Sequence, residues 1–386
     1  MTFLIRFEPL FNAYMIMDGG EFYEIEANRL EELVEGVENV RIIELSGNPD
    51  KAFGSPLKVQ IQLSEHCNMR CETCAVYDRK SLAWLSTNQI FQILDKLSDV
   101  GVLNVQWSGG EPLLRADFLD LVNYAAEKGF QQNCYTNATM LTEKLALALK
   151  QQLFKMQISF DGIEEIFEAI VGVKLWKKFE RGLSIAVSTG IPNVILATVL
   201  QEKNVKHMER IVRYAGTSGI NRLRISMLVP IGRARHISWS NYSSIINQFR
   251  IDWPRLKKIA AEYDLEIDCF LEKEPCLDKR IDDVGRIISP GGHSFLYINA
   301  EGTMFPFPFL AGKEFKLGSI FIDDLKKTWF ESGVLKNLRR QTYKNTGCEL
   351  CRFECAFAER SLVYAFTGQI NSRALAHPEC QIERRW

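Results

Sequence analysis

Three cysteines in the first quarter of the chain have the spacing of an iron–sulfur site. Cys67, Cys71 and Cys74 read C-x3-C-x2-C. Three thiolates can hold a [4Fe–4S] cube and leave its fourth iron open for another ligand. Structural zinc normally takes four ligands as two spaced pairs, and in the sequence no Cys or His follows Cys74 closely enough to complete such a set. The spacing therefore favours an open cluster over a zinc or redox-thiol site.

A second cysteine group stands near the end of the sequence. Cys348, Cys351 and Cys355 read C-x2-C-x3-C, and Cys380 follows in H-P-E-C. Four cysteines hold either a fully ligated [4Fe–4S] cube or a zinc ion, and spacing alone does not separate the two. A fully ligated cube has no open iron, so its expected role is electron transfer or structure.

The remaining three of the ten cysteines belong to neither group. Cys134 and Cys269 lie in predicted strands, where a cysteine is usually a small buried hydrophobic residue. Cys276, in E-P-C-L-D, is a vestigial ligand, a hydrogen-atom donor or a residue without a special role. Only weak catalytic candidates emerge: Asp161, Cys276 and Glu359.

The segment from about 57 to 230 alternates six apolar strands with amphipathic helices. The predicted helix over 86–101 places Ile90, Ile93, Leu94 and Leu97 at i, i+3, i+4 and i+7. Such alternation predicts a parallel α/β sheet with right-handed crossovers, whose ligands gather at the C-terminal ends of the strands. Several polar or glycine residues stand at these ends: Gly109, Gly110, Glu111, Thr136, Asn137, Ser159, Asp161 and Thr198.

The cysteine loop and the segment after the next strand together resemble a known family. C-x3-C-x2-C, followed by Trp107-Ser108-Gly109-Gly110-Glu111-Pro112, resembles the radical S-adenosylmethionine (SAM) enzymes over about residues 57–230. The resemblance implies a partial (β/α)6 barrel and a [4Fe–4S] cluster whose open iron is chelated by SAM. It also implies reductive cleavage of SAM to a 5′-deoxyadenosyl radical, which takes a hydrogen atom from the substrate.

The same resemblance suggests which residues bind SAM at the second strand. Gly109 and Gly110 would let the backbone approach SAM closely. Glu111 or neighbouring carbonyls would accept from the methionyl amine, unless the segment is only a strand-to-helix turn with Pro112 near the helix start. In the family an aromatic residue usually precedes the third cysteine and packs on adenine, whereas this chain has Thr73.

Three further strand ends complete the expected SAM and substrate site. Ser159 and Asp161, in I-S-F-D-G, resemble the fourth strand end, where polar side chains meet the SAM carboxylate or the substrate; the alternative is an Asp-Gly turn. Thr136 and Asn137 resemble the third strand end and either face SAM or cap a loop. Thr198 is the weakest of these candidates.

The tail cysteines, with the predicted hairpin at 294–308, resemble the cysteine-rich accessory domain called SPASM. That domain carries two auxiliary [4Fe–4S] clusters in many peptide-modifying members. The ligands of the inner cluster are missing here, because the matching regions read S-P-G-G-H, F-P-F-P-F and A-F-A-E. The resemblance thus implies one auxiliary cluster on the four tail cysteines, making two [4Fe–4S] clusters in all.

These features predict an α/β protein in three parts. Residues 1–56 are a strand-rich extension and a candidate peptide-docking element, 57–240 the radical SAM barrel, and 241–386 bridging helices with the SPASM-like auxiliary cluster domain. Lys plus Arg is 47 against 48 Asp plus Glu, which disfavours nucleic-acid binding through bulk charge. With no bilayer-length apolar run and no signal peptide, no membrane contact and a cytoplasmic location are expected.

The resemblance favours a ribosomally synthesised precursor peptide as the substrate, to be crosslinked, oxidised, epimerised or excised. Because 56 residues are short for a peptide-recognition domain, a separate leader-recognition protein is expected, and flavodoxin or ferredoxin would supply electrons. The alternative enzyme is a radical SAM oxidase or isomerase acting on a small molecule such as an amino sugar or cofactor precursor. The non-enzyme alternative is a structural iron–sulfur or zinc protein.

Overall fold

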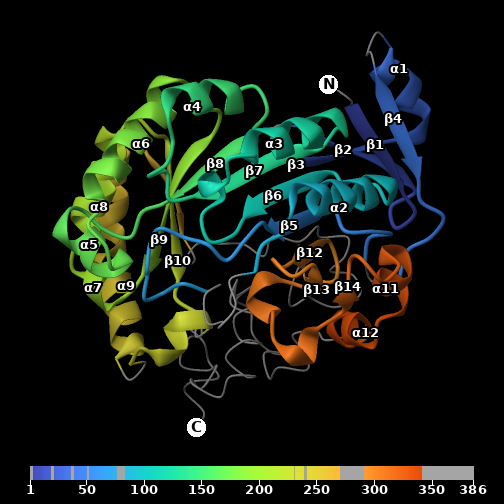
Figure 1. Cartoon of the computed structure of the whole chain (residues 1–386). Helices are drawn as coiled ribbons and strands as arrows, with labels where there is room; N and C mark the ends of the chain where they lie inside the picture. Colours follow the sequence, from blue (N-terminus) through green and yellow to red (C-terminus); the bar gives the residue numbers. More distant parts are fainter. Residues whose placement is uncertain are drawn as a thin grey trace.

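Two β-sheets organise the part of the chain that the computed structural model describes (Figure 1). The described residues are 3–18, 21–35, 39–49, 52–75, 83–229, 231–238, 241–269 and 291–340. The remaining candidates lie outside the described residues: Cys276, Cys348, Cys351, Cys355, Glu359 and Cys380.

The larger sheet has ten strands in the order β11-β10-β9-β8-β7-β6-β5-β12-β13-β14. Its centre is six parallel strands: β5 (Lys58–Gln62), β6 (Asn104–Ser108), β7 (Gln131–Thr136), β8 (Lys155–Ser159), β9 (Val194–Leu200) and β10 (Arg222–Met227). Each of these strands is hydrogen-bonded to the strand that follows it in the sequence. Consecutive right-handed β/α units produce this order of strands. The predicted six-unit parallel fold is thereby confirmed.

Helices cover the outer face of these strands (Figure 1). They are α2 (Thr87–Asp99), α3 (Phe118–Glu127), α4 (Glu143–Leu149), α5 (Glu165–Val171), α6 (Trp176–Ser188), α7 (Glu202–Val205), α8 (Met208–Thr217) and α9 (Tyr242–Ala261). In α2 the four predicted apolar residues are fully buried. Ser86 and Gln89 form a capping box at its start, each side chain accepting from the other's backbone N–H. No helix among the described residues is long and apolar enough to span a bilayer.

The two faces of the central strands differ in chemistry. Apolar residues such as Val59, Val105 and Met156 are fully buried in the core that the helices share. The alternate residues are polar and bond to one another across the inner face. Three such bonds run from Gln60 Nε2 to Ser108 Oγ (2.9 Å), from Tyr135 Oη to Gln106 Oε1 (2.9 Å), and from Arg224 Nη1 to Gln157 Oε1 (3.1 Å). Because a strand alternates its side chains, the inside of this barrel is polar.

Further strands extend the sheet beyond both ends of the barrel. β11 (Glu266–Cys269) pairs in parallel with β10, and β12 (Phe295–Ile298) pairs in parallel with β5. β13 (Thr303–Phe305) and β14 (Gly318–Ser319) follow as antiparallel neighbours, then α11 (Leu325–Glu331) and α12 (Gly333–Arg340). The predicted hairpin around Asn299–Gly302 is confirmed, and Gly302 takes the left-handed φ of +77° that this turn requires.

The short 3-10 helices lie in the connections. They are η1 (Ala27–Arg29), η2 (Pro112–Leu114), η3 (Gly232–His236), η4 (Pro308–Leu310) and η5 (Lys313–Phe315).

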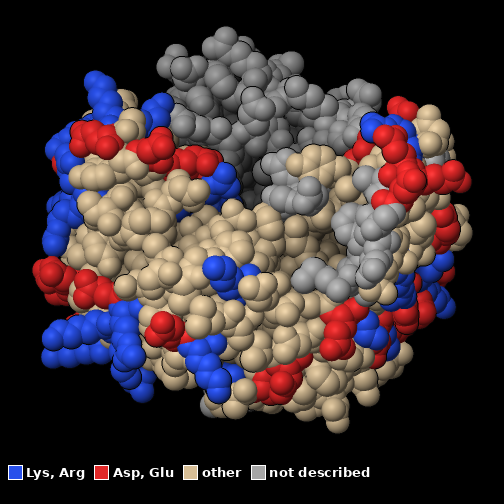
Figure 2. Space-filling view, turned by 90° about the horizontal axis from the view of Figure 1, so that it is seen from above, with Lys and Arg blue, Asp and Glu red and all other residues tan. Residues whose placement is uncertain are grey.

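Seen from above, the molecule carries charged side chains of both signs around the rim of the visible face, whose centre is largely uncharged (Figure 2).

The smaller sheet is formed by the N-terminal residues in the order β3-β2-β1-β4. It comprises β1 (Phe3–Glu8), β2 (Ala13–Asp18), β3 (Glu21–Ile25) and β4 (Val40–Glu44), with α1 (Leu30–Val34) between the last two. The structure agrees with the strand-rich character that the sequence predicts for this segment, and it adds β4, which the sequence did not indicate. Its segment V-R-I-I-E is short, and its strand state depends on parallel pairing with β1, a contact distant in sequence.

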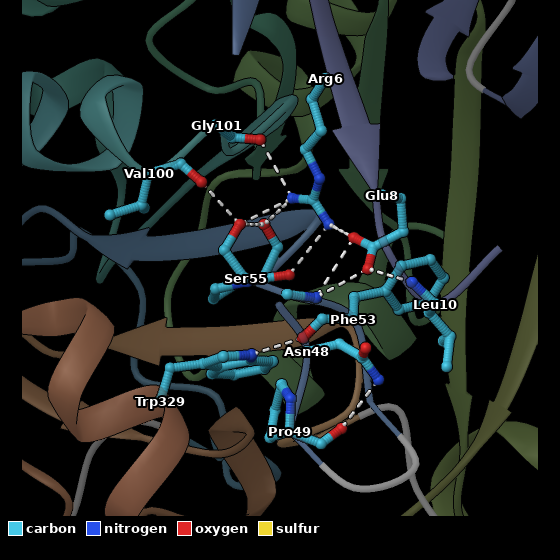
Figure 3. A network of polar contacts seen from close by, with 12 residues as sticks. Arg6, Glu8, Leu10, Asn48, Pro49, Phe53, Ser55, Val100, Gly101 and Trp329 are labelled. Atoms are coloured by element: carbon cyan, nitrogen blue, oxygen red, sulfur yellow. Dashed lines mark hydrogen bonds and ion pairs between the residues drawn. The ribbon is translucent and has the colours of Figure 1, made fainter. Parts of the chain in front are cut away.

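A fully buried ion pair fastens the N-terminal sheet to the barrel (Figure 3). Arg6 Nη2 donates to Glu8 Oε2 at 2.6 Å, and both side chains are 0% exposed. Arg6 Nη1 also donates to Ser55 Oγ (2.7 Å) and to the Gly101 carbonyl (3.0 Å), which leads into β6. Glu8 Oε1 accepts from the backbone N–H of Gly54 at 2.9 Å. One guanidinium therefore joins β1, the approach to β5 and the turn after α2.

Replacing Arg6 by Met is expected to lower the free energy of unfolding by about 3–5 kcal/mol, because Glu8 would remain buried without its cation. Urea unfolding under anaerobic conditions measures the change. The control is Arg41→Met, whose pair with Asp99 is exposed and worth under about 1 kcal/mol. Equal effects of the two substitutions would contradict the structural importance assigned to the buried pair.

Candidate active site

The three loop cysteines follow β5, at the C-terminal edge of the parallel sheet. The loop is held at its middle, where the N–H of Arg70 donates to the carbonyl of Val171 at 2.7 Å. The thiols interact electrostatically, and burial, followed by the charge of Asp161, raises the pKa of Cys71. Within the described part of the chain, no three His, Cys, Asp or Glu side chains are gathered closely enough to hold a single metal ion.

Gly109 and Gly110 place the end of β6 directly against the backbone that leads into this loop. The N–H of Gly110 donates to the carbonyl of Ser64 at 2.7 Å. A Cβ on Gly110 would lie 2.0 Å from the carbonyl oxygen of His66 and 2.9 Å from the nitrogen of Cys67. A Cβ on Gly109 would lie 2.9 Å from the Ser64 oxygen. The glycines thus shape the cysteine loop, a reason for their small size that the sequence analysis did not give.

Glu111 joins the ends of two strands. Its side chain, in a residue only 1% exposed, accepts from Thr136 Oγ1 at 2.6 Å and from the N–H of Asn137 at 2.7 Å, both at the end of β7. It also accepts from the N–H of Leu113, so it caps η2. Burial raises the pKa of Glu111, while these three donors oppose the rise. The Glu111 carboxylate therefore holds the ends of β6 and β7 together.

The side chain of Asn137 reaches from β7 to the cysteine loop. Its Nδ2 donates to Asn68 Oδ1 at 2.9 Å and lies 4.0 Å from Cys67 Sγ. Asn68 Nδ2 in turn donates to Thr139 Oγ1 at 2.8 Å. The sequence analysis missed Asn68 and Thr139, because nothing in their spacing links the two segments.

Ser159, Asp161 and Thr198 lie at two neighbouring strand ends but differ in what they contact. Ser159 is exposed and makes no side-chain hydrogen bond with the described residues. Asp161 Oδ1 accepts from the N–H of Val199 at 2.7 Å and from Thr198 Oγ1 at 3.4 Å, and Thr198 is 0% exposed. Burial raises the pKa of Asp161 to about 6. Asp161 and Thr198 thus link β8 to β9. Ser159, which is exposed and has no side-chain partner among the described residues, is open to a ligand.

The segment after β10 closes on the other end of the cysteine loop. The N–H of Arg233 donates to the carbonyl of Cys74 at 2.9 Å, and the Arg233 charge lowers the pKa of Cys71 against the larger effect of burial. Gly232 has a φ of +54°, and a Cβ there would lie 2.2 Å from the Cys74 oxygen. The sequence analysis did not identify this glycine–arginine pair, since Gly232 lies 158 positions after Cys74 in the sequence.

The residues present fit an iron–sulfur cluster with an open iron. Three thiol donors share one loop, and a cube offers a separate iron to each thiolate. The loop is packed backbone to backbone against Gly110 and Gly232, so its path is fixed by close contacts. By contrast, Cys134 and Cys269 are 0% and 2% exposed, and their predicted burial is confirmed.

Comparison with known proteins agrees with this geometry. The family described as Radical SAM superfamily matches residues 61–215. Mycofactocin maturase MftC of Mycobacterium tuberculosis is 27% identical over 295 residues, which cover 75% of this chain and 74% of the relative. PqqA peptide cyclase of Rhodopseudomonas palustris is 37% identical over 134 residues, covering 34% of this chain and 36% of the relative.

A solved structure shares the fold over most of the chain. Streptococcus suis SuiB bound to its precursor peptide SuiA superposes with a TM-score of 0.67 at 15% identity, covering 93% of this chain and 94% of SuiB. The cysteine loop, the parallel barrel and the family match together identify residues 61–215 as a radical SAM domain, and the chain is an enzyme that uses SAM and a [4Fe–4S] cluster.

Proposed function

We propose that this radical SAM enzyme modifies a ribosomally synthesised precursor peptide. The observation that carries the proposal is the similarity to mycofactocin maturase MftC over three quarters of the chain. PqqA peptide cyclase and SuiB, which is seen bound to the precursor peptide SuiA, support the same substrate class. The polar inner face of the barrel supports it too, because a peptide needs hydrogen-bond partners there.

In this proposal Cys67, Cys71 and Cys74 hold the [4Fe–4S] cluster. A [4Fe–4S] cluster bound there would supply the electron for the reductive cleavage of SAM. The backbone at Gly109 and Gly110 would bind the methionyl group of SAM, and the hydroxyl of Ser159 would donate to its carboxylate.

The other candidate residues hold the strand ends and the cysteine loop of this site in position. Glu111 and Thr136 hold the ends of β6 and β7 together, and Asn137 positions the cysteine loop. Thr198 orients Asp161, which is a proton-acceptor candidate because its pKa of about 6 leaves it ionised at neutral pH. Cys276 and Glu359 remain weaker catalytic candidates.

The second cluster and the partners complete the proposal. Cys348, Cys351, Cys355 and Cys380 hold one auxiliary [4Fe–4S] cluster in residues 241–386, with zinc as the alternative that metal analysis would reveal.

Residues 57–240 form the catalytic barrel. Residues 1–56 offer the edge strand β3, to which a leader peptide could add as a further strand. A separate leader-recognition protein and a flavodoxin or ferredoxin would act with the enzyme in the cytoplasm, where thiols stay reduced.

The test is to incubate the anaerobically reconstituted enzyme with SAM, a reductant and each short peptide encoded beside its gene. We expect 5′-deoxyadenosine formation that depends on one of these peptides, together with a mass change in that peptide. Omitting SAM is the control. Turnover of an amino sugar or cofactor precursor, with every peptide unchanged, would overturn the proposed substrate class.

A further inference from the structure

Lys155 and Arg224 lie on the polar inner face of the barrel, outside the SAM site described above. Lys155 begins β8 and is followed on the same face by Gln157 and Ser159, since alternate residues of a strand share a face. Arg224 stands on β10 beside Ala197, and Ala197 stands beside Ser159. Arg224 is thus in the same row as Ser159, and Lys155 is about 13 Å further down β8, at about 3.3 Å per residue.

Among the described residues, Lys155 forms no ion pair, although the charge of Asp268 acts on it. It is partly buried, and its Nζ makes no hydrogen bond or ion pair with the described residues. Burial, and then the charges of Arg224, Lys58 and Arg222, lower the pKa of Lys155 to about 8. The nearby anion Asp268 is already held by Arg224 Nε at 2.6 Å. An additional anion placed beside Lys155 would therefore be attracted by the positive charges of Lys155 and its basic neighbours.

Two buried amides of the barrel strands each have one side-chain atom without a hydrogen-bond partner among the described residues. Asn133 pairs in register with Lys155 on the neighbouring strand and is 4% exposed, and its Oδ1 accepts no hydrogen bond from the described residues. On β5, Gln62 is 2% exposed; its Oε1 accepts from Tyr297 Oη at 2.7 Å, and its Nε2 donates no hydrogen bond to the described residues. Buried polar atoms normally have partners. The missing partners and the unpaired lysine point to a ligand that carries an anion and an N–H donor, as a peptide residue does.

We propose that Lys155 and Arg224 form a subsite that binds a carboxylate of the substrate peptide. The guanidinium of Arg224 uses Nε for Asp268 and Nη1 for Gln157, and its Nη2 makes no hydrogen bond with the described residues. Nη2 and Lys155 Nζ then donate charge-assisted hydrogen bonds to the carboxylate. This inference rests on the proposed function for the identity of the ligand. The carboxylate comes from an acidic side chain or from a peptide C-terminus.

Protection of Lys155 from acetylation tests the subsite without requiring turnover. The reconstituted enzyme is treated with acetic anhydride, and labelling of Lys155 is compared by mass spectrometry with that of exposed Lys150. The probes, each at about 10 mM, are three acetylated tripeptides: Ala-Glu-Ala with an amidated C-terminus, Ala-Ala-Ala with a free C-terminus, and Ala-Ala-Ala amide.

We expect a carboxylate peptide to slow labelling of Lys155 about fourfold if its Kd is a few millimolar, with Lys150 unaffected. Protection by amidated Ala-Glu-Ala identifies a side-chain carboxylate, and protection by free Ala-Ala-Ala identifies a C-terminus. Equal protection by the neutral peptide, or protection by none, would overturn the subsite.

A pair of double variants separates a specific site from general charge. Arg224→Gln with Asp268→Asn removes the cation without leaving a buried carboxylate unpaired, and should abolish protection. The matched control is Arg222→Gln with Glu266→Gln, an equivalent pair on the same two strands that is more exposed, and it should retain protection. Equal loss in both would refute the assignment to Arg224. Protection that persists when no peptide is turned over would leave the subsite intact and refute only the proposed function.

Discussion

Changing Cys67, Cys71 and Cys74 together to alanine is expected to abolish SAM cleavage. The substitution removes every thiol of the loop after β5, so the cluster that delivers the electron has no ligands. Chromatography of 5′-deoxyadenosine after dithionite reduction measures cleavage. Iron analysis should show a loss of about four atoms per chain, while iron at the proposed auxiliary site remains.

The control for this triple variant is Cys134→Ala. Cys134 is a free, fully buried cysteine of β7 that lies outside the loop, so iron content and cleavage should persist. Cleavage at the parental rate in the triple variant would show that another part of the chain holds the catalytic cluster.

Replacing Gly110 by alanine should impair the enzyme nearly as strongly, although no ligand is removed. Its Cβ would lie 2.0 Å from the His66 carbonyl oxygen, so the backbone before Cys67 must move. A displacement near 1 Å in a catalytic constellation can cost about a hundredfold in rate. We expect SAM cleavage to fall by about that factor, with weaker iron retention during gel filtration.

The matched substitution is Gly47→Ala, where the added Cβ has no neighbour within 4 Å. That variant should cleave SAM at the parental rate. Full activity in Gly110→Ala would mean that the cysteine loop does not need the close backbone contact with β6.

The barrel could be predicted from sequence because its signals are local. Strands such as 59–63 alternate apolar and polar residues, and the helix over 86–101 carries both its apolar stripe and its capping box within 16 residues. The cysteine and glycine motifs are equally local. Their position after strand ends then follows from the parallel topology.

The rest of the site depends on contacts between distant segments. Asn68 meets Asn137, and Arg233 meets Cys74, only after the barrel has formed. The strand β4 exists through its pairing with β1, and Arg6 finds its partners near residues 55 and 101. Neither periodicity nor motif spacing encodes these pairings. The role of Glu111 in joining β6 to β7 was equally hidden, since the sequence does not show which donors surround a carboxylate.

The most direct test of the central claim is hydrogen transfer from peptide to SAM-derived product. The peptide that the enzyme modifies in the incubation test is synthesised with deuterated amino acids and incubated with the enzyme, unlabelled SAM and a reductant. We predict that the 5′-deoxyadenosine formed carries deuterium and that the peptide is modified. Unlabelled 5′-deoxyadenosine alongside an unmodified peptide, from enzyme with an intact reduced cluster, would contradict the account.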